Sequence, residues 1–203
     1  MEKKYRLTDE TVEFLGRTLH RIEALKNFAT SDGALVRVGK KGGWVESENN
    51  LSHDGNAWVY DGARVYGDAQ VYGDAWVYGN ARVYGNARVY GDALVYGNAW
   101  VHGNAWVYGD ALVYGNALVY GNARVYEPWH ILVIGPIGSR NDYTTFFQGK
   151  DRKIYVKCGC FRGDIKEFTA KVEETHGNNH HGKMYKLAIE MAKEQIEVGG
   201  TND

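Results

Sequence analysis

Residues 55–126 repeat one six-residue pattern twelve times without interruption, from GNAWVY at the start to GNARVY at the end. Each unit has Gly with Asn or Asp, then Ala, a variable residue, Val and, in all but one copy, Tyr. A fixed short period indicates an array in which each unit buries its apolar side only by stacking on the next unit. Very few folds are open to such a chain.

The pattern separates small side chains from large ones. Because side chains alternate along a strand, the Ala and Val of each unit point one way, while the variable residue and the Tyr point the other way. Gly with Asn or Asp is typical of a tight corner, since these residues adopt left-handed backbone angles at low cost. The predicted core is Ala57, Val59 and their equivalents at every sixth position up to Ala123 and Val125.

Two arrangements satisfy this alternation. A meander of tight hairpins would leave a flat sheet with one Ala and Val face and one aromatic face, and no other segment is long enough to cover either face. Coiling with three short strands per turn makes a prism whose interior is just wide enough for Val and Ala. Coiling is therefore favoured.

The unit resembles the hexapeptide repeat of left-handed parallel β-helix proteins, which have an aliphatic residue at one inward position and a small residue two places earlier. The resemblance implies a mainly β fold with a three-sided, left-handed solenoid of about four regular coils. The hand is taken from the resemblance, since parallel crossovers are usually right-handed. At about 4.8 Å per coil, the prism would be roughly 19 Å tall.

Residues eighteen apart stack on one face of such a prism. One face has no charge in its rows and should exceed the apolar area that a monomer normally exposes. We expect it to be covered by another subunit, in a dimer or trimer, or by the chain's own terminal segments. The alternative is that aromatic residues simply suit an exposed β surface. This face consists of Trp58, Trp76, Leu94 and Leu112 beside Tyr60, Tyr78, Tyr96 and Tyr114.

The other two faces mix arginine with aromatic residues. Such a mixture resembles a surface on which single-stranded nucleic acid stacks, although Asp residues at the corners balance the charge. The net charge of −1 argues against a dedicated binder of DNA or of anionic membranes. Nucleic-acid binding is thus a minor alternative. The second face carries Arg64, Arg82, Trp100 and Leu118, and the third carries Gln70, Arg88, Trp106 and Arg124.

Residues 1–44 are predicted to cap the open end of the solenoid, which would otherwise expose unpaired strand groups and apolar side chains. Residues 5–7 and 12–15 are expected to form short strands. The apolar spacing of residues 19–28 is near-helical, with a strand as the alternative.

Val45 and Leu51 resemble two imperfect repeat units, followed by a two-residue insertion near His53, so the solenoid domain is placed at residues 45–127. The GGWVE and NLS strings of this lead-in resemble uncharacterised hexapeptide-repeat proteins of bacteriophages and prophages. That resemblance implies a viral accessory protein acting in the cytoplasm of a bacterial host, without implying a chemistry.

Pro128 ends the array, because proline cannot donate to the strand ladder. A small α+β domain is predicted at residues 128–198 and a disordered tail at residues 199–203. Asp164 and Glu167 have the spacing of a helix capping box. The expected elements are strands at 131–134, 143–147 and 154–158 and helices at 164–177 and 183–198.

The remaining composition predicts a soluble intracellular protein. No stretch approaches the ~18 apolar residues that cross a bilayer, and the first residues, MEKKYRLTDE, lack the core of a signal peptide. Two cysteines are too few for the disulfide framework of a secreted protein.

Hexapeptide proteins are often acyltransferases. The resemblance therefore implies, as an alternative function, an enzyme that binds coenzyme A between subunits and uses a histidine base. This sequence departs from that pattern, because no loop interrupts the regular units. His102, the one histidine of the array, replaces a Tyr and is interpreted as a tolerated surface residue. Acyl transfer is kept as an alternative, and no catalytic residue is assigned.

Cys158, Cys160, His176, His180 and His181 offer ligand types that zinc prefers. The single residue between the cysteines is shorter than the usual spacing in zinc sites. A buried structural cysteine with exposed histidines is the favoured interpretation, and no metal or cofactor is predicted.

Residues 135–140, GPIGSR, form a glycine-rich turn that ends in Ser139 and Arg140. Backbone amides and an arginine fork can bind phosphate, although most such turns have no ligand. Arg162 precedes a predicted helix start, where an anion is favoured electrostatically. Convergence of these groups would favour a phosphate-bearing small molecule as the ligand.

These observations together predict a non-enzymatic interaction protein. The β-helix would be a rigid, self-associating stalk, and the C-terminal domain would recognise a partner. In a phage setting, the expected partner is a host protein or a signalling nucleotide, sequestered to blunt a defence system. This last step depends on the resemblance alone.

Overall fold

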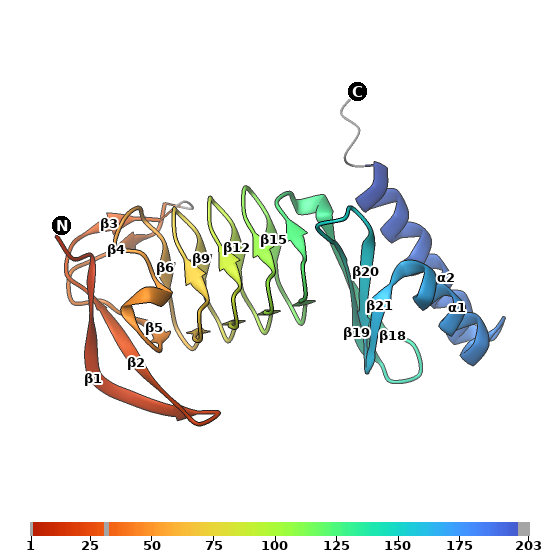
Figure 1. The fold of residues 1–203 in the computed structure, drawn as a ribbon, viewed down its shortest axis with the longest axis horizontal. Helices are drawn as coiled ribbons and strands as arrows, with labels where there is room; N and C mark the ends of the chain where they lie inside the picture. Colours follow the sequence, from red (N-terminus) through yellow and green to blue (C-terminus); the bar gives the residue numbers. More distant parts are fainter. Residues whose placement is uncertain (1, 31–32, 199–203) are drawn as a thin grey trace.

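The computed structural model describes residues 2–30 and 33–198. An N-terminal segment, a β-solenoid and a C-terminal α+β unit follow one another along a single long axis (Figure 1). The predicted mainly β fold built on a solenoid is confirmed. The predicted disordered tail, residues 199–203, lies outside the described residues.

Each repeat unit forms a two-residue strand from its variable residue and its Val. Parallel pairing joins strands eighteen residues apart, such as Trp76 with Leu94 and Arg82 with Trp100. The three predicted faces are therefore confirmed as three stacked sheets. The strands are β6 (Trp58–Val59), β7 (Arg64–Val65), β8 (Gln70–Val71), β9 (Trp76–Val77), β10 (Arg82–Val83), β11 (Arg88–Val89), β12 (Leu94–Val95), β13 (Trp100–Val101), β14 (Trp106–Val107), β15 (Leu112–Val113), β16 (Leu118–Val119) and β17 (Arg124–Val125).

The axis of the solenoid is filled by the Ala and Val of every unit, each at most 1% exposed. Full burial of a Val side chain contributes about 1.5–3 kcal/mol, so the repeated core is the main source of stability. Glycines with positive φ form the corners. Gly91, at φ +68°, lies so close to the next coil that an added Cβ would come within 2.8 Å of the Gly109 nitrogen. Both backbone angle and space require glycine there.

Identical side chains stack in columns along the outside, because the coils repeat in register. The rings of Tyr78 and Tyr96 are 4.8 Å apart and nearly parallel. Asn86 Nδ2 donates to Asn104 Oδ1 at 3.1 Å in a ladder at one corner. The outer surface is thus ordered by the same repeat that fills the core.

A further coil precedes the regular repeats. Strand β5 (Lys41–Val45) pairs in parallel with β7, which places Val45 on Val65, and Leu51 bridges Val71. These partners are twenty residues apart, as expected from the two-residue insertion. The two imperfect units of the lead-in are confirmed, and the described part of the chain forms a solenoid of about five turns.

The N-terminal segment is a long antiparallel hairpin, β1 (Tyr5–Phe14) and β2 (Arg17–Ala24). The two short strands predicted here are instead one strand with a register shift between Leu7 and Thr11. Strand β2 also pairs with β5, so the hairpin extends one of the solenoid sheets. In Figure 1 the hairpin leaves the column at an angle and its tip points along the solenoid.

A helix at residues 19–28 is wrong, and the strand alternative is confirmed. Leu19 and Ile22 are buried, but their segment bonds to β1 on one side and to β5 on the other. The end sheet of the solenoid offers unpaired backbone groups, and pairing with them overrides the helical spacing. Strands β3 (Phe28–Ala29) and β4 (Leu35–Val36) form a separate small sheet.

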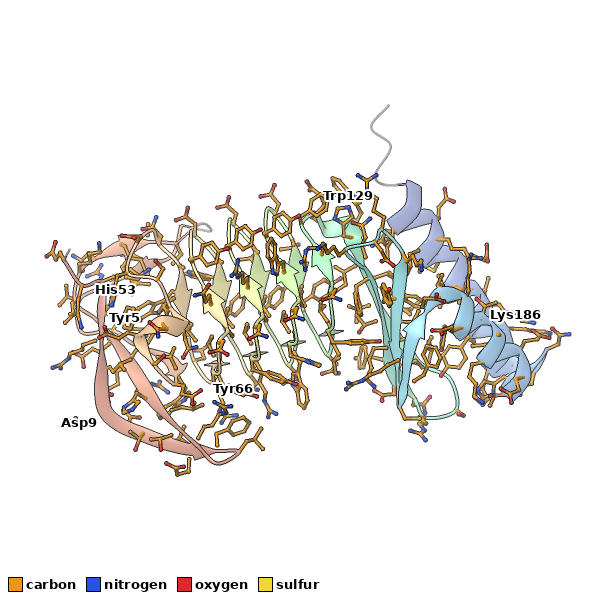
Figure 2. All side chains as sticks on the ribbon, viewed as in Figure 1. Tyr5, Asp9, His53, Tyr66, Trp129 and Lys186 are labelled. Carbon is orange, nitrogen blue, oxygen red and sulfur yellow. The ribbon has the colours of Figure 1, made fainter. Side chains whose placement is uncertain are left out.

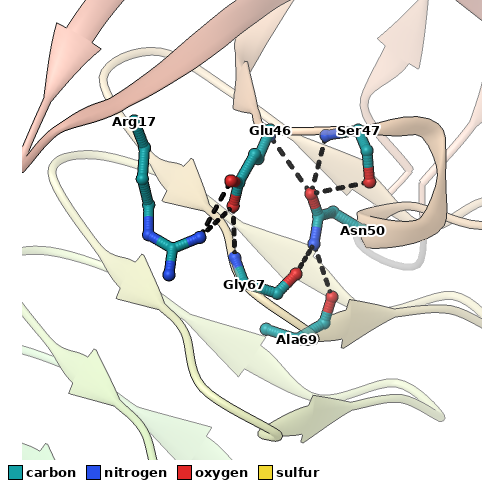
Figure 3. A network of polar contacts seen from close by, with 6 residues as sticks. All are labelled: Arg17, Glu46, Ser47, Asn50, Gly67 and Ala69. Carbon is teal, nitrogen blue, oxygen red and sulfur yellow. Dashed lines mark hydrogen bonds and ion pairs between the residues drawn. The ribbon is translucent and has the colours of Figure 1, made fainter.

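Polar side chains satisfy the backbone at this end of the column (Figure 3). Asn50 Nδ2 donates to the carbonyls of Gly67 and Ala69 at 2.8 and 2.9 Å. The Glu46 carboxylate accepts from the Gly67 amide at 2.7 Å and pairs with Arg17 at 2.8 Å. These contacts replace the hydrogen bonds that a preceding coil would have supplied.

Two short 3-10 turns flank the regular repeats, η1 (Glu48–Asn50) and η2 (Pro128–His130). The amide of Glu127 donates to Nδ1 of His130 at 3.2 Å, and the imidazole is buried. Asn50 has the equivalent place in η1. The chain thus enters and leaves the regular repeats through the same kind of turn, closed by one buried acceptor.

The C-terminal unit is an antiparallel sheet with two helices on the side away from the solenoid (Figure 1). A fourth strand follows the three that were predicted. The elements are β18 (Ile131–Ile137), β19 (Asp142–Gln148), β20 (Ile154–Cys158), β21 (Phe161–Asp164), α1 (Ile165–His176), α2 (His180–Lys193) and the π-helical turn η3 (Glu194–Val198).

The predicted capping box of α1 is confirmed. The Asp164 carboxylate accepts from the Glu167 amide, and the Glu167 carboxylate accepts from the Asp164 amide, both at 2.9 Å. Helix α2 begins three residues earlier than predicted, because the Asn179 side chain accepts from the Gly182 amide and caps it there. None of the described helices has both the length and the apolar composition that a membrane crossing requires.

The C-terminal sheet closes the second end of the solenoid through alternate residues of β19. Phe147 packs with the solenoid core, whereas Phe146 packs with the helices. Thr145 Oγ1 also accepts from the Leu118 amide at 3.1 Å. One strand with period-two alternation therefore serves two separate cores.

Candidate functional site

A pocket of about 340 Å³ opens on the helical side of the C-terminal unit. It lies between the turn that joins β20 to β21, helix α1 and the loop before β19. Its apolar walls are the side chains of Phe161, Phe168 and Val172. Its polar groups are Ser139, Arg140, Asp142, Cys158, Cys160, Lys171, Thr175, His176 and Tyr185.

Close packing of glycines positions the polar side chains of this pocket. Gly159, at φ +54°, forms the turn beneath Arg140, and an added Cβ would lie 3.4 Å from Arg140 Nη1. At Gly138 an added Cβ would clash with the Tyr185 hydroxyl. Because neither glycine has a side chain, the guanidinium and the hydroxyl approach the turn and the loop closely.

Tyr185 is the buried polar group at the base of the pocket. Cys158 Sγ donates to its hydroxyl at 3.5 Å. Burial, together with the Cys158 thiol, raises the pKa of Tyr185, so the phenol stays protonated at neutral pH. The phenol hydroxyl of Tyr185 can donate to or accept from a ligand, and the sulfur of Cys158 is a weaker hydrogen-bonding partner beside it.

The pocket brings together three of the side chains considered for zinc, Cys158, Cys160 and His176. His180 does not line it; its ring lies 5.8 Å from that of His181. Within residues 2–30 and 33–198, no group of three or more His, Cys, Asp or Glu side chains is arranged to hold a metal ion.

Ser139 and Arg140 lie in the pocket, but Arg162 does not. The Arg162 guanidinium lies 5.2 Å from the ring of Tyr120, on the side of the sheet that faces the solenoid. Phe161, the preceding residue, lines the pocket on the other side. Alternation along β21 thus places Arg162 on the opposite side of the sheet from Arg140. The predicted convergence of Arg162 with Arg140 at one anion site is wrong.

A larger hollow of about 520 Å³ lies where the solenoid meets the C-terminal sheet. Its polar groups already bond to one another: Tyr155 donates to Asp151 at 3.1 Å, and the Lys150 amide donates to the Asn122 carbonyl at 2.9 Å. The smaller pocket has the less satisfied polar groups and is the stronger candidate.

His102 lies within a column of rings on the solenoid. It stacks on Tyr84 at 4.8 Å and on Tyr120 at 6.0 Å. Burial, and then the nearby Arg162, lowers the pKa of His102. Its Nε2 is buried and has no hydrogen-bond partner among the described residues. The imidazole occupies the place of a stacked Tyr.

Trp106 carries the arginine and aromatic mixture of the third face. Arg124 and Arg88, from the coils on either side, lie 4.2 and 5.2 Å from its ring. Cation–π contacts of this kind are favourable where the groups are partly buried. The indole faces that a nucleic-acid base would need are therefore already occupied by arginine.

The uncharged face of the solenoid is covered at its first coil by the chain itself. Trp58 is 1% exposed and packs edge-on against Phe28 at 5.3 Å and Tyr5 at 6.2 Å. Trp58 is therefore unavailable as an intersubunit contact. Further along, Trp76 is half-buried, and Tyr114 is 45% exposed. The sequence did not reveal which coil the N-terminal segment covers.

The repeats are similar to a known solenoid family. A family model for the YdcK beta solenoid repeat matches residues 63–79, 69–85, 75–89 and 87–103. This is a repeat β-helix protein. No curated protein matches the chain. All the matched residues lie in the solenoid, so the comparison supports the scaffold and leaves the pocket to be argued from its own residues.

Proposed function

We propose that this chain is a non-enzymatic interaction protein. The solenoid serves as a rigid scaffold, and the C-terminal unit recognises a host protein or a phosphate-bearing small molecule such as a signalling nucleotide. The position of the pocket supports this division of roles. It opens on the helical side of a sheet whose other side, through Phe147, is packed into the solenoid. A ligand there would be held at the end of a filled column.

The biological setting follows from the lead-in. Its GGWVE and NLS strings, at residues 42–46 and 50–52, resemble hexapeptide-repeat proteins of bacteriophages and prophages. We therefore propose a phage accessory protein in the bacterial cytoplasm that sequesters a host factor and so blunts a defence system. Native mass spectrometry of protein purified from infected cells tests this. A stoichiometric host protein or nucleotide in the spectrum is expected, and its absence from protein purified under gentle conditions contradicts the proposal.

Self-association is the second part of the proposal. The uncharged face beyond Trp58 would form a dimer or trimer through rows of large apolar side chains. These are Trp76, Leu94 and Leu112 with Tyr78, Tyr96 and Tyr114. At Tyr60, the Nζ of Lys40 lies 5.0 Å from the centre of the ring. A flat apolar surface of this length is favourable to bury.

Light scattering on Trp76→Arg tests the interface. The wild-type chain is expected to have the mass of a dimer or trimer, and the variant that of a monomer, because a buried unpaired arginine is costly. Gln70→Arg adds the same charge on the third face and is the matched control. A monomeric wild-type protein, or an unchanged mass in Trp76→Arg, removes the interface.

Two alternatives are tested on the same protein. Acetyl-coenzyme A turnover that disappears in His102→Ala would favour an acyltransferase. Salt-sensitive binding of a single-stranded oligonucleotide that weakens in Arg88→Gln would favour a nucleic-acid binder. The contacts of His102 with Tyr84 and of Arg88 with Trp106 argue against both.

A further inference from the structure

We propose that the pocket of the C-terminal unit binds a small anion with a flat aromatic body, in which an aromatic ring system carries one carboxylate or phosphate group. This inference deepens the proposed function, since it rests on the C-terminal unit being the recognition module. It names the chemistry of the ligand from the side chains that would contact it.

The walls of the pocket are suited to a flat apolar group. The ring of Phe168 lies 5.1 Å from that of Phe161 and packs edge-on against that of Tyr185 at 5.6 Å. Val172 completes this surface from α1. The volume of about 340 Å³ is at the lower end of that of small-molecule sites, which suits one or two fused rings. Aromatic side chains at these angles favour a planar ligand.

The mouth of the pocket selects for negative charge through one group. Arg140 has no hydrogen bond or ion pair with any other residue that the structure describes. The other cation, Lys171, is already paired with Glu174 at 2.8 Å. Arg140 is therefore the cation available to a ligand, and its planar fork matches a carboxylate or a phosphate oxygen pair.

The balance of charge favours a ligand that carries a single anionic group. Asp142 lines the same pocket, so a second anionic group, away from Arg140, would be repelled by this carboxylate. Ser139, beside Arg140, adds a hydroxyl that can donate to the same anionic group.

The pocket also contains its own reporter. The sequence has two cysteines, and both Cys158 and Cys160 line this pocket. Cys160 is exposed, whereas Cys158 is half-buried against Tyr185. A ligand over the turn should shield Cys160, and no other thiol in the chain contributes to the signal.

Alkylation of the full chain by iodoacetamide, followed by intact mass, tests the proposal. The probes are 2-naphthoate, 2-naphthyl phosphate and the neutral 2-naphthamide. We expect at least one of the two anions to slow alkylation about tenfold at roughly ten times its dissociation constant, and the amide to have little effect. Protection by only one anion identifies whether carboxylate or phosphate is selected.

Variants locate the effect. Arg140→Gln should abolish protection by the anions, and so should Thr175→Trp, which places a large side chain at an exposed position of the wall. Lys166→Gln, an exposed change on the same helix outside the pocket, should leave it intact. Equal protection by the amide, protection that persists in Arg140→Gln and Thr175→Trp, or no protection by any probe overturns the proposal.

Light scattering on the same samples distinguishes failure of the ligand site from failure of self-association. Their mass is measured by light scattering alongside alkylation. A monomer that still shows anion protection removes self-association and leaves the ligand site. An oligomer without protection removes the ligand site and leaves self-association.

Discussion

Lys4 Nζ donates to the carbonyl of Ala57 at 2.8 Å, from a side chain that is fully buried. The same ammonium reaches the Gly55 carbonyl at 3.2 Å and lies 5.5 Å from the ring of Phe28. These carbonyls belong to the first regular coil, and Tyr5, the residue after Lys4, is labelled at this end of the column in Figure 2. A cation from the N-terminal segment therefore completes the hydrogen bonds that another coil would have made.

Lys4→Met should lower the free energy of unfolding by about 2 kcal/mol at neutral pH, because two buried carbonyls lose their donor. Urea denaturation measures this. Lys3→Met is the matched control, since Lys3 pairs with Glu48 at the surface at 2.6 Å, and such pairs contribute at most about 1 kcal/mol. Equal effects of the two substitutions would contradict the capping role of Lys4.

Lys4 should also make stability depend on alkaline pH. Burial lowers its pKa from 10.5 to about 8, so between these values the folded protein binds fewer protons than the unfolded chain. The free energy of unfolding therefore rises with pH above about pH 8, by at most roughly 1.4 kcal/mol per pH unit. Comparing wild type with Lys4→Met up to about pH 9.5, below tyrosine titration, should show a steeper rise in wild type. Parallel curves would rule this out.

His130 should make stability fall on acidification. Its Nδ1 accepts from the Glu127 amide at 3.2 Å, and burial lowers the pKa of His130 below 6.5. The contribution of neutral His130 to the free energy of unfolding is complete above about pH 6.5 and is lost as the pH falls through the lower pKa of the folded state. His130→Asn keeps an acceptor of the kind that Asn50 provides at the other end of the regular repeats. It should therefore reduce the difference in the free energy of unfolding between about pH 7 and about pH 5.

The measurement is urea denaturation at both pH values, with His180→Asn as the control at an exposed site. His102, whose pKa is also lowered, contributes equally to every variant. The prediction fails where His130→Asn retains the full acid sensitivity of the wild type.

Two corner glycines separate backbone strain from steric contact. Gly91 and Gly115 have φ of +68° and +63°, but an added Cβ meets the Gly109 nitrogen at 2.8 Å only from Gly91, and meets nothing within 4 Å from Gly115. Gly115→Ala should cost about 1 kcal/mol from its backbone angle. Gly91→Ala should cost at least twice as much, as read from thermal midpoints. Similar costs would show that the coils separate easily.

The repeat by itself determined most of the solenoid. A six-residue period with Ala and Val two places apart specifies which side chains are inside, and stacking at eighteen residues specifies each row, as Trp76 on Leu94 shows. The capping box of Asp164 with Glu167 was equally readable. All these features depend on neighbours that recur at a fixed short distance along the chain.

Only the tertiary structure decided how the two ends of the solenoid are closed and which side chains meet in the pocket. The segment around Leu19 became a strand because the solenoid edge offered it backbone partners, and Trp58 was covered because Phe28 folds back over it. Arg140 joined Cys160 while Arg162 was turned to the other side of the sheet. Contacts between segments far apart in sequence leave no periodic signal, so their outcome depends on which unpaired edges and apolar surfaces meet in space.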